Sequence, residues 1–516
     1  MHVVTAPLRP DRPRIIVIGA GIAGLAAALR LAVGGMHVTL LERHAAPGGK
    51  IRTVPSRVGP VDAGPTVLTL RHVFDDLFAC AGTRLSDHVT LVQQTVLARH
   101  FWPDGSSLDL HADPVQTRHA IASFAGNRAA DEFTVFHRRT RTLFKAFDAP
   151  MMQAPAPRMQ DLIQHVLKRP TLLPAMAPLS TMRQVLKRSF SDPRLSQLFG
   201  RYATYVGGAP HLSPALLALI WQAEAEGVWV VEGGMHKLAQ AIAKLAQHSG
   251  VDIRYNTHVD RIILHQGRVS GVEIDGTYLL EAEAVLYAGD PRAIATGSMG
   301  DALRTVAPQT VTQPRSFSAR VHTFAATPKG RDLLHHNVFF AEDPDTEFKD
   351  LVAGRMPAQP TLYLCAEDRG QTTPPPALER FEMIANAPAD PTPTPAKELD
   401  QWHHQIMQKM ADMGVTFTPN PTAMTITTPQ HFADLFPQTL GALYGQTPHG
   451  LTAAFKRPTA QTSIAGLWLA GGGTHPGAGV PMATLSARHA AEAILQDRTS
   501  TSTLARTATP GGMSTD

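Results

Sequence analysis

Three glycines near the N-terminus have the spacing of a turn that binds a dinucleotide. Gly19, Gly21 and Gly24 follow the apolar segment RIIVI and open the Ala- and Leu-rich segment LAAALRL. The first glycine allows a tight turn, the second lets the backbone approach a diphosphate, and the third lets a helix pack closely on its sheet. The spacing alone is weak evidence, but the strand pattern before it and the helix pattern after it argue against an accidental match.

Glu42 ends a second apolar segment, HVTLLE, and is placed to hold the ribose of that dinucleotide. A carboxylate there accepts hydrogen bonds from free ribose hydroxyls and repels a 2′-phosphate, so NADP is disfavoured. The start of the intervening helix would add partial positive charge beneath the diphosphate. FAD and NAD both remain as candidates.

The segment after Glu42 adds further groups that suit a diphosphate. Arg43 and Lys50 can meet phosphate oxygens, and Gly48 and Gly49 allow close approach of the backbone. The competing interpretation is that Arg43 and Lys50 are solvated charges at a strand end. Arg52 is a weaker candidate for the same role.

The elements that must position these residues follow from the patterns along the chain. Residues 14–42 are predicted to form a strand, a helix and a second strand, and residues 71–82 a helix. Residues 113–225 have a helical pattern with Pro-rich breaks, and strands resume at residue 228. The Pro-rich residues 371–397 are expected to form a surface loop. The Ser/Thr-rich residues 497–516 are expected to be disordered.

Composition narrows the class of protein. The chain has 516 residues, 43% of them apolar, and a formal net charge of +4, which is too small for a nucleic-acid-binding surface. Cys80 and Cys365 stand far apart, so neither a disulfide framework nor a zinc site is predicted. The N-terminus lacks a secretory signal, and the longest apolar run, residues 15–29, is too short to span a bilayer. We expect a cytoplasmic protein.

The 24 histidines do not predict a metal site. His335 with His336, and His403 with His404, are adjacent pairs that we expect to point in different directions, without a facing carboxylate.

The residues around Glu42 resemble the flavin-containing amine oxidase and carotenoid desaturase superfamily. The ERxxxxGG pattern of that superfamily implies contacts to FAD from Glu42, Arg43, Gly48 and Gly49. The resemblance extends to VDAGPT, whose Gly64 and Pro65 would lie near the isoalloxazine.

Two further positions match the superfamily's flavin site. GGGTHPGAGVPM is similar to the C-terminal flavin motif of the carotenoid desaturases. It implies that Gly472 lies near the phosphates and that the backbone at Val480 and Met482 meets the flavin pyrimidine edge. Val259 matches the position that flanks the adenine. An ordinary Gly-rich turn before a surface helix is the competing interpretation of the C-terminal motif.

The same resemblance implies an α/β fold with a Rossmann-type FAD-binding domain, a β-sheet substrate domain and an inserted helical lobe. The FAD-binding domain would comprise residues 11–72, 228–290 and 460–496. The substrate domain would comprise residues 73–112 and 291–459. The helical lobe, facing the membrane, would span residues 113–227.

Several passages resemble one branch, the 1-hydroxycarotenoid 3,4-desaturases, also called methoxyneurosporene dehydrogenases. They include GPTVLTLRHVFDDLF, FWPDGSSLDLHADP and TLYLCAEDRG. This branch introduces a C-3,4 double bond into 1-hydroxy or 1-methoxy acyclic carotenoids, in the spheroidene or spirilloxanthin-type biosynthesis that serves photosynthesis. The alternatives are a phytoene desaturase, a carotenoid isomerase, an amine oxidase, or a flavin-less lipid-binding or prenyl-chaperone protein.

The catalytic base is not predicted. Glu224 and Glu226, in AEAEG, could accept a proton, but an acid pair at a helix end commonly has a structural or solvated role. His475, within the C-terminal flavin motif, is expected to fix the local backbone.

A carotenoid substrate implies contact with a membrane. Residues 159–190 mix Leu, Met and Val with Lys168, Arg169, Lys187 and Arg188, as an interfacial surface would. A helix face packed on the core, with its basic residues solvated, is the competing interpretation. From the composition of residues 159–190 we expect peripheral attachment to the inner or intracytoplasmic membrane.

The electron acceptor is expected to be oxygen or a membrane quinone, because the sequence contains no second GxGxxG that could bind NAD.

Overall fold

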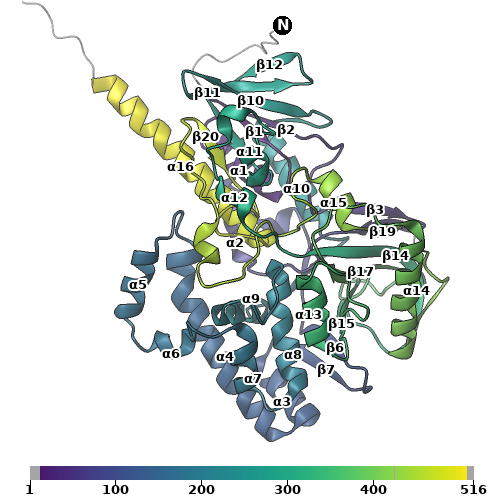
Figure 1. The fold of residues 1–516 in the computed structure, drawn as a ribbon. Helices are drawn as coiled ribbons and strands as arrows, with labels where there is room; N and C mark the ends of the chain where they lie inside the picture. Colours follow the sequence, from purple (N-terminus) through teal and green to yellow (C-terminus); the bar gives the residue numbers. More distant parts are fainter. Residues whose placement is uncertain (1–11, 423–424, 508–516) are drawn as a thin grey trace, which may run out of the picture.

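The computed structural model describes residues 12–422 and 425–507, with side chains as far as Asp497. Its parallel sheet combines strands from both ends of the chain (Figure 1). Neighbouring strands run parallel in the order β20 (Leu467–Leu469), β13 (Ala284–Tyr287), β1 (Arg14–Ile18), β2 (His37–Leu41) and β9 (Asp252–Arg254). Helix α1 (Ile22–Val33) joins β1 to β2, which confirms the predicted strand–helix–strand unit.

Helix α1 is buried on almost every side because other helices pack over it. Its Ala- and Leu-rich sequence presents small side chains that permit this close approach. Helices α10 (His236–His248), α16 (Val480–Thr507) and α2 (His72–Cys80) contact α1. Residues from α1, α10 and α16 share one apolar core with the parallel sheet, so the N- and C-terminal segments fold as one layer.

A second, larger sheet lies beside this layer (Figure 1). Its strands follow the order β18 (Val415–Thr418), β14 (Ser318–Gly330), β17 (Glu379–Ala387), β16 (Leu362–Ala366), β15 (His336–Phe339), β6 (Val96–Phe101) and β7 (Ser107–His111). Strand β19 (Ile426–Thr427) also pairs with β14. The pairs are antiparallel except β15 with β6. Helix α14 (Ala396–Asp412) packs on this sheet through Trp402, Ile406 and Met410.

Residues 113–225 form the predicted helical region, which lies at the end of the molecule opposite the parallel sheet (Figure 1). Its helices are α3 (Pro114–Ala125), α4 (Asn127–Phe147), η2 (Asp148–Met152), α5 (Met159–Leu167), α6 (Leu172–Met176), α7 (Met182–Ser189), α8 (Pro193–Gly200), η3 (Arg201–Val206), η4 (Ala215–Leu219) and α9 (Ile220–Ala225). Its core is rich in aromatic side chains, among them Phe133, Phe199 and Trp221.

Smaller elements connect these layers. The strand pairs are β3 (Thr53–Ser56) with β4 (Gly59–Asp62), and β5 (Leu91–Gln93) with β8 (Trp229–Val231). An antiparallel sheet comprises β10 (Val259–His265), β11 (Arg268–Ile274) and β12 (Tyr278–Glu281). The remaining helices are η1 (Leu85–Asp87), α11 (Pro291–Ala295), η5 (Asp301–Leu303), α12 (Gln309–Thr312), α13 (Pro344–Val352), α15 (Pro429–Leu435) and η7 (Ala453–Lys456).

The Pro-rich residues 371–397 are not one surface loop, so that prediction is wrong. Their middle forms strand β17, which pairs with β14 and β16 in the interior of the second sheet. The prolines flank ERFEMIANA and do not interrupt it, so every residue of the strand can donate to the ladder.

The C-terminal tail also differs from its prediction as far as it is described. Helix α16 continues to Thr507, because no Gly or Pro interrupts the chain between Met482 and that residue. Residues 508–516, which are also expected to be disordered, lie outside the described residues.

Candidate active site

The glycine turn lies between β1 and α1, at the carboxyl edge of the parallel sheet. Gly19 has a φ of 100° and donates its N–H to the Leu41 carbonyl over 2.8 Å. A Cβ on Gly24 would lie 1.9 Å from the Gly19 carbonyl oxygen, whereas one on Gly21 would meet no protein atom within 4 Å. Gly24 is therefore required for packing, while Gly21 keeps the outer side of the turn accessible to a ligand.

Glu42 is 5% exposed and links the glycine turn to the segment that follows β2. One carboxylate oxygen accepts from the Ala20 N–H over 2.6 Å, and the other accepts from the His44 N–H over 2.8 Å. Each oxygen retains a lone pair that a ribose hydroxyl could use. The Glu42 carbonyl accepts from the Thr257 N–H over 2.8 Å, which brings the chain before Val259 alongside.

Gly48 and Gly49 lie against the glycine turn. The Gly48 N–H donates to the Ala20 carbonyl over 2.8 Å, and Gly48 forms an isolated parallel bridge with Gly21. Both glycines have positive φ angles, of 118° and 58°. Arg43 is exposed and makes no hydrogen bond or ion pair with any residue that the structure describes. The side chain of Arg43 is therefore available to a ligand.

Residues 64–66, here called the GPT turn, contact residues 48–50, here called the GGK segment. A Cβ on Gly64 would lie 1.9 Å from the Lys50 carbonyl oxygen, and the Ala63 N–H donates to the Arg52 carbonyl over 2.9 Å. Pro65 follows in the same turn. The Arg52 side chain turns towards the second sheet, where it donates to Thr427 Oγ1 over 2.7 Å. Its predicted place beside a phosphate has no support in this geometry.

The C-terminal motif completes the site from the opposite end of the chain. The Gly472 carbonyl accepts from Arg457 Nη1 over 2.7 Å, and the Gly471 N–H donates to Ser486 Oγ over 3.1 Å. Val480 is the first residue of α16 and lies in the same core as α1, while Met482 is partly buried.

His475 shares a hydrogen bond with a backbone carbonyl of the helical lobe, so it links the C-terminal motif to a distant segment and not to its own local backbone. Its Nε2 lies 2.9 Å from the Ala154 carbonyl oxygen. Burial lowers the pKa of His475 to about 4, so its ring is neutral at physiological pH.

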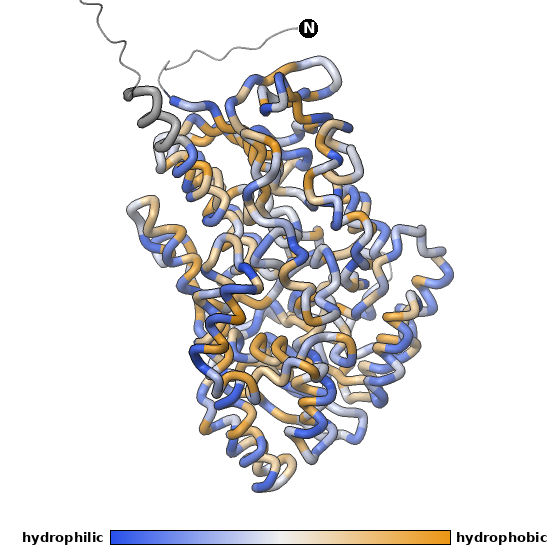
Figure 2. The backbone as a smooth tube through the Cα atoms, turned by 60° about the vertical axis from the view of Figure 1, so that its left-hand side comes forward, coloured by the Kyte–Doolittle hydropathy of each residue, from blue (hydrophilic) through white to orange (hydrophobic). Residues whose placement is uncertain are grey.

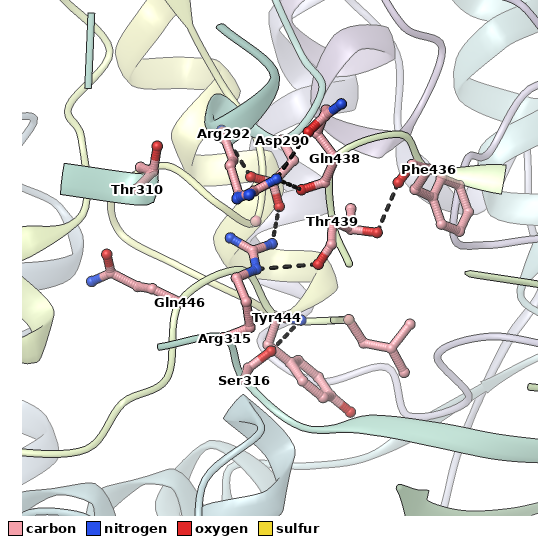
Figure 3. A network of polar contacts seen from close by, with 12 residues as sticks. Asp290, Arg292, Thr310, Arg315, Ser316, Phe436, Gln438, Thr439, Tyr444 and Gln446 are labelled. Atoms are coloured by element: carbon pink, nitrogen blue, oxygen red, sulfur yellow. Dashed lines mark hydrogen bonds and ion pairs between the residues drawn. The ribbon is translucent and has the colours of Figure 1, made fainter. Parts of the chain in front are cut away.

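A buried basic cluster lies beside these segments, and the sequence did not predict it. Arg315 forms an ion pair with Asp290 and donates through Nε to the Thr439 carbonyl over 3.2 Å (Figure 3). Burial lowers the pKa of Lys50 to about 8 and that of Arg457 to about 10, with Asp290 opposing and Arg315 adding to both shifts. Arg315 pairs directly with Asp290, whereas Lys50 Nζ donates to the Leu443 carbonyl and Arg457 Nη1 to the Gly472 carbonyl. The three basic groups outnumber the one carboxylate, and this excess of positive charge attracts an anion.

One signal in the sequence could have identified part of this cluster. Asp290 follows β13 at the carboxyl edge of the parallel sheet and caps α11, accepting from the Arg292 N–H over 3.0 Å. An acid before a proline, directly after a buried strand, is a recognisable helix start. Arg457 stands in an irregular segment without such a pattern.

Glu224 and Glu226 have different environments. Glu224 is buried and accepts hydrogen bonds from the Tyr202 and Tyr205 hydroxyls, the latter over 2.7 Å. Glu226 is exposed and accepts from Gln222 Nε2 over 2.9 Å. Both arrangements are structural or solvated, and neither identifies a base.

His335 and His336 approach one another, so the expectation that this pair points apart is wrong. Their ring centroids lie 4.5 Å apart because His335 precedes β15 and is not held by its alternation. Possible ligand atoms of His335, His336 and Cys365 lie within 4.8 Å of each other. His335 Nδ1 is hydrogen-bonded to the Arg369 carbonyl and His336 Nδ1 to the Tyr363 hydroxyl, which favours a hydrogen-bonding role. For His403 and His404 the ring centroids lie 5.7 Å apart.

Three buried acids underlie the GPT turn. Asp62 accepts from the backbone N–H groups of Met235 and His236 at the start of α10. Burial raises the pKa of Glu367 to about 9, and the neighbouring Asp62 adds to the shift. Burial also raises the pKa of Glu382 well above its usual value. Glu367 is therefore protonated at neutral pH, and burial disfavours negative charge on the other two acids beneath the turn.

The residues present fit FAD. The open side of Gly21 suits a diphosphate, Glu42 has free lone pairs for a ribose, and the basic cluster can compensate negative charge. Gly48, Gly64 and Gly472 bring three further segments of backbone to the same place.

Comparisons with known proteins agree with this geometry. A family model described as flavin-containing amine oxidoreductase matches residues 22–495. The chain is 50% identical to the hydroxyneurosporene desaturase of Cereibacter sphaeroides, over 96% of this chain and all of that protein. The enzyme of the same name from Rhodobacter capsulatus is also 50% identical, over 94% of this chain and 98% of that protein.

Solved structures share the fold at low sequence identity. A putrescine oxidase bound to putrescine superimposes with a TM-score of 0.60 at 14% identity, covering 95% of this chain and 99% of that one. An oxidoreductase from Methanosarcina mazei gives a TM-score of 0.58 at 15% identity, covering 93% and 100%. The predicted α/β fold class and the predicted cofactor, FAD, are confirmed.

Proposed function

The chain belongs to the flavin-containing amine oxidoreductase family, and we propose that it is an FAD-dependent carotenoid desaturase. Its reaction would be the introduction of a C-3,4 double bond into 1-hydroxy or 1-methoxy acyclic carotenoids. Two relatives named hydroxyneurosporene desaturase, each 50% identical over nearly the whole chain, support this substrate class.

The observation that carries the proposal is the meeting of four chain segments at the carboxyl edge of the parallel sheet. The glycine turn, the GGK segment, the GPT turn and the C-terminal motif lie around the buried basic cluster. We assign FAD binding to Gly19, Gly21, Gly24, Glu42, Arg43, Gly48, Gly49, Lys50, Gly64, Pro65, Val259, Gly472, Val480 and Met482. Arg315 and Arg457 join this set.

The chemistry requires the loss of a hydride from C4 and of a proton from C3. Because C4 is allylic, the positive charge left there is delocalised over the polyene, and no protein anion needs to stabilise it. FAD, when bound, supplies the two-electron acceptor. The basic cluster and the backbone N–H groups at the start of α16 favour the negative charge that this acceptance generates.

We propose that the lobe around α5 and α6 attaches the enzyme to a membrane surface. Large apolar side chains are exposed there, including Ile163, Leu167 and Leu179, next to the exposed Lys168 and Arg169. Hydrophobic and hydrophilic residues alternate along the helices of the lobe (Figure 2), as interfacial helices require. Within the described residues, each helix is too short or too polar to cross a bilayer.

The electron acceptor that we propose is oxygen or a membrane quinone. The sequence contains no second GxGxxG, so a separate NAD site has no support. A membrane-attached enzyme would meet a quinone in the same bilayer as its carotenoid.

The test is conversion of defined carotenoids by the purified holoenzyme. We expect 1-hydroxyneurosporene to give a product with one more conjugated double bond and a red-shifted absorbance. Phytoene, tested in the same vesicles, serves as the matched control because it lacks the hydroxyl group. If phytoene alone were converted, the enzyme would be a phytoene desaturase and the proposed substrate would be wrong.

A further inference from the structure

A buried polar network lies within the helical lobe, between η3 and α9. Glu224 on α9 accepts from the hydroxyls of Tyr202 and Tyr205, which both belong to η3. Arg201, the first residue of η3, donates through Nη1 to the Tyr205 hydroxyl over 3.0 Å. Its guanidinium lies over the rings of Tyr202 and Tyr205, 5.2 and 5.1 Å from their centroids. The Tyr205 hydroxyl therefore links Arg201 to Glu224, whose negative charge compensates that of the guanidinium.

A second chain of hydrogen bonds approaches this network from the GPT turn. Thr66 Oγ1 lies 2.7 Å from the Tyr363 hydroxyl, which lies 2.6 Å from His336 Nδ1. The two chains lie near enough for their groups to influence one another electrostatically. Burial lowers the pKa of His336 and Arg201 adds to that shift, while burial raises the pKa of Tyr363 and Tyr205 adds to it. His336 and Tyr363 are therefore neutral.

Arg201 has hydrogen-bond donors without a protein partner. Arg201 is 8% exposed, yet neither its Nε nor its Nη2 meets an acceptor among the residues that the structure describes. His336 Nε2, also buried, likewise has no partner there. Buried donors are almost always satisfied because leaving them unpaired is costly. Unpaired guanidinium N–H groups at this position point to a ligand that supplies an acceptor.

The network lies between two segments that we assign to the flavin. Thr66 directly follows Gly64 and Pro65. On the other side, Ala223, the neighbour of Glu224 on α9, packs in the same apolar cluster as Met482. In a 1-hydroxycarotenoid, C1 is three bonds from the reacting C4, which is about 4 Å for C–C bonds of about 1.5 Å. A group that binds the oxygen on C1 must therefore lie beside the flavin, as this network does.

We propose that Arg201 binds the oxygen atom on C1 of the carotenoid, with Tyr205 and Glu224 positioning its guanidinium. This inference rests on the proposed function and names the residues that determine its substrate class. A guanidinium only donates, so its ligand must accept a hydrogen bond. Hydroxyl and methoxy oxygens both accept, and an unsubstituted hydrocarbon end does not. Such an end would leave the buried donors unpaired, which is how a polar site rejects an apolar analogue.

The test is a competition between 1-hydroxyneurosporene and neurosporene, which lacks the oxygen, at equal concentrations with the holoenzyme. We expect the wild-type enzyme to form product mainly from the hydroxylated substrate. In Arg201→Met the ratio of kcat/KM for the two substrates should fall by about 10- to 100-fold, mainly because the KM for the hydroxylated substrate rises. The visible spectrum of the bound flavin serves as the readout of an intact cofactor site.

Arg139→Met is the matched control. Arg139 is also a lobe arginine with an unpartnered Nη2, but its Nε donates to the Ala175 carbonyl, away from the network. The control should keep the wild-type ratio. If Arg201→Met failed to bind FAD, Tyr205→Phe would replace it, because it keeps the ring and removes only the hydroxyl that positions Arg201. A several-fold loss of preference is expected there.

The outcomes separate the two claims. An unchanged preference in Arg201→Met, or equal losses for both substrates with the flavin spectrum retained, would overturn the role of Arg201. A wild-type enzyme that converts neurosporene but not 1-hydroxyneurosporene would contradict the proposed function itself.

Discussion

The glycines after β1 differ in what an added methyl group would touch. A Cβ on Gly24 would collide with the Gly19 carbonyl oxygen at 1.9 Å, whereas one on Gly21 would meet no protein atom within 4 Å. We expect Gly24→Ala to lower both stability and FAD binding. Gly21→Ala should keep the Tm of the FAD-free protein within a few degrees and weaken FAD binding by more than about tenfold. Thermal denaturation with FAD titration measures both, and an unaltered FAD affinity in Gly21→Ala would show that the turn does not face the diphosphate.

The lowered pKa of Lys50 predicts how the affinity of the protein for FAD depends on pH. Burial lowers its pKa to about 8 in the FAD-free protein, so it loses its charge above that pH. The diphosphate attracts the charged form, and the Kd of FAD should rise by up to about tenfold per pH unit above that pKa. Because the unfolded chain keeps the proton up to its ordinary pKa of 10.5, the free energy of unfolding of the FAD-free protein should increase with pH over the same interval.

Lys50→Arg is the matched control for this titration, because an arginine stays charged. Its Kd for FAD should be nearly constant between about pH 7 and about pH 9. The same slope in the variant as in the wild type would assign the pH dependence to another group.

At the scale of single helices and strands, sequence patterns predicted some elements and missed others. The segments of residues 14–42 could be predicted because an apolar strand, a glycine turn and an Ala/Leu-rich helix carry local signals. Strand β17 could not, because prolines on both sides of ERFEMIANA suggest a loop, and its place between β14 and β16 depends on distant partners. The helical path of α16 beyond Gln496 was missed because a Ser- and Thr-rich composition is also typical of disordered tails.

The exposed apolar residues of α5, α6 and the following turn predict membrane binding. Leu167, Leu173 and Leu179 are 70%, 46% and 92% exposed. Replacing all three with Ser should raise the Kd for anionic liposomes at low salt by at least about tenfold, because each substitution removes several apolar carbon groups that would insert into the interface. Liposome co-sedimentation of the purified, detergent-free enzyme measures this effect.

Val352→Ser is the control for that experiment, since Val352 is 47% exposed at the end of α13, outside the lobe. Equal effects of the two substitutions, or a wild-type protein that does not bind liposomes, would refute attachment through α5 and α6.

At the scale of the whole molecule, the proposed cofactor site depends on contacts that no local pattern contains. The glycine turn and the C-terminal motif have their own sequence signatures, so these two segments of the proposed site could be identified from the sequence. The cluster of Lys50, Arg315 and Arg457 around Asp290 was not, because its members come from four separate segments brought together only by folding. The network of Arg201, Tyr205 and Glu224 has the same origin, and so does the hydrogen bond between Thr66 of the GPT turn and Tyr363.

The most direct test of the central claim is an anaerobic single turnover. Holoenzyme mixed with excess 1-hydroxyneurosporene should bleach its oxidised-flavin absorbance and form one equivalent of a carotenoid with one more conjugated double bond. Admission of oxygen or a quinone should then restore the oxidised flavin. Product formed without bleaching of the flavin, or a bleached flavin without a desaturated carotenoid, would contradict the assignment of this protein as an FAD-dependent carotenoid desaturase.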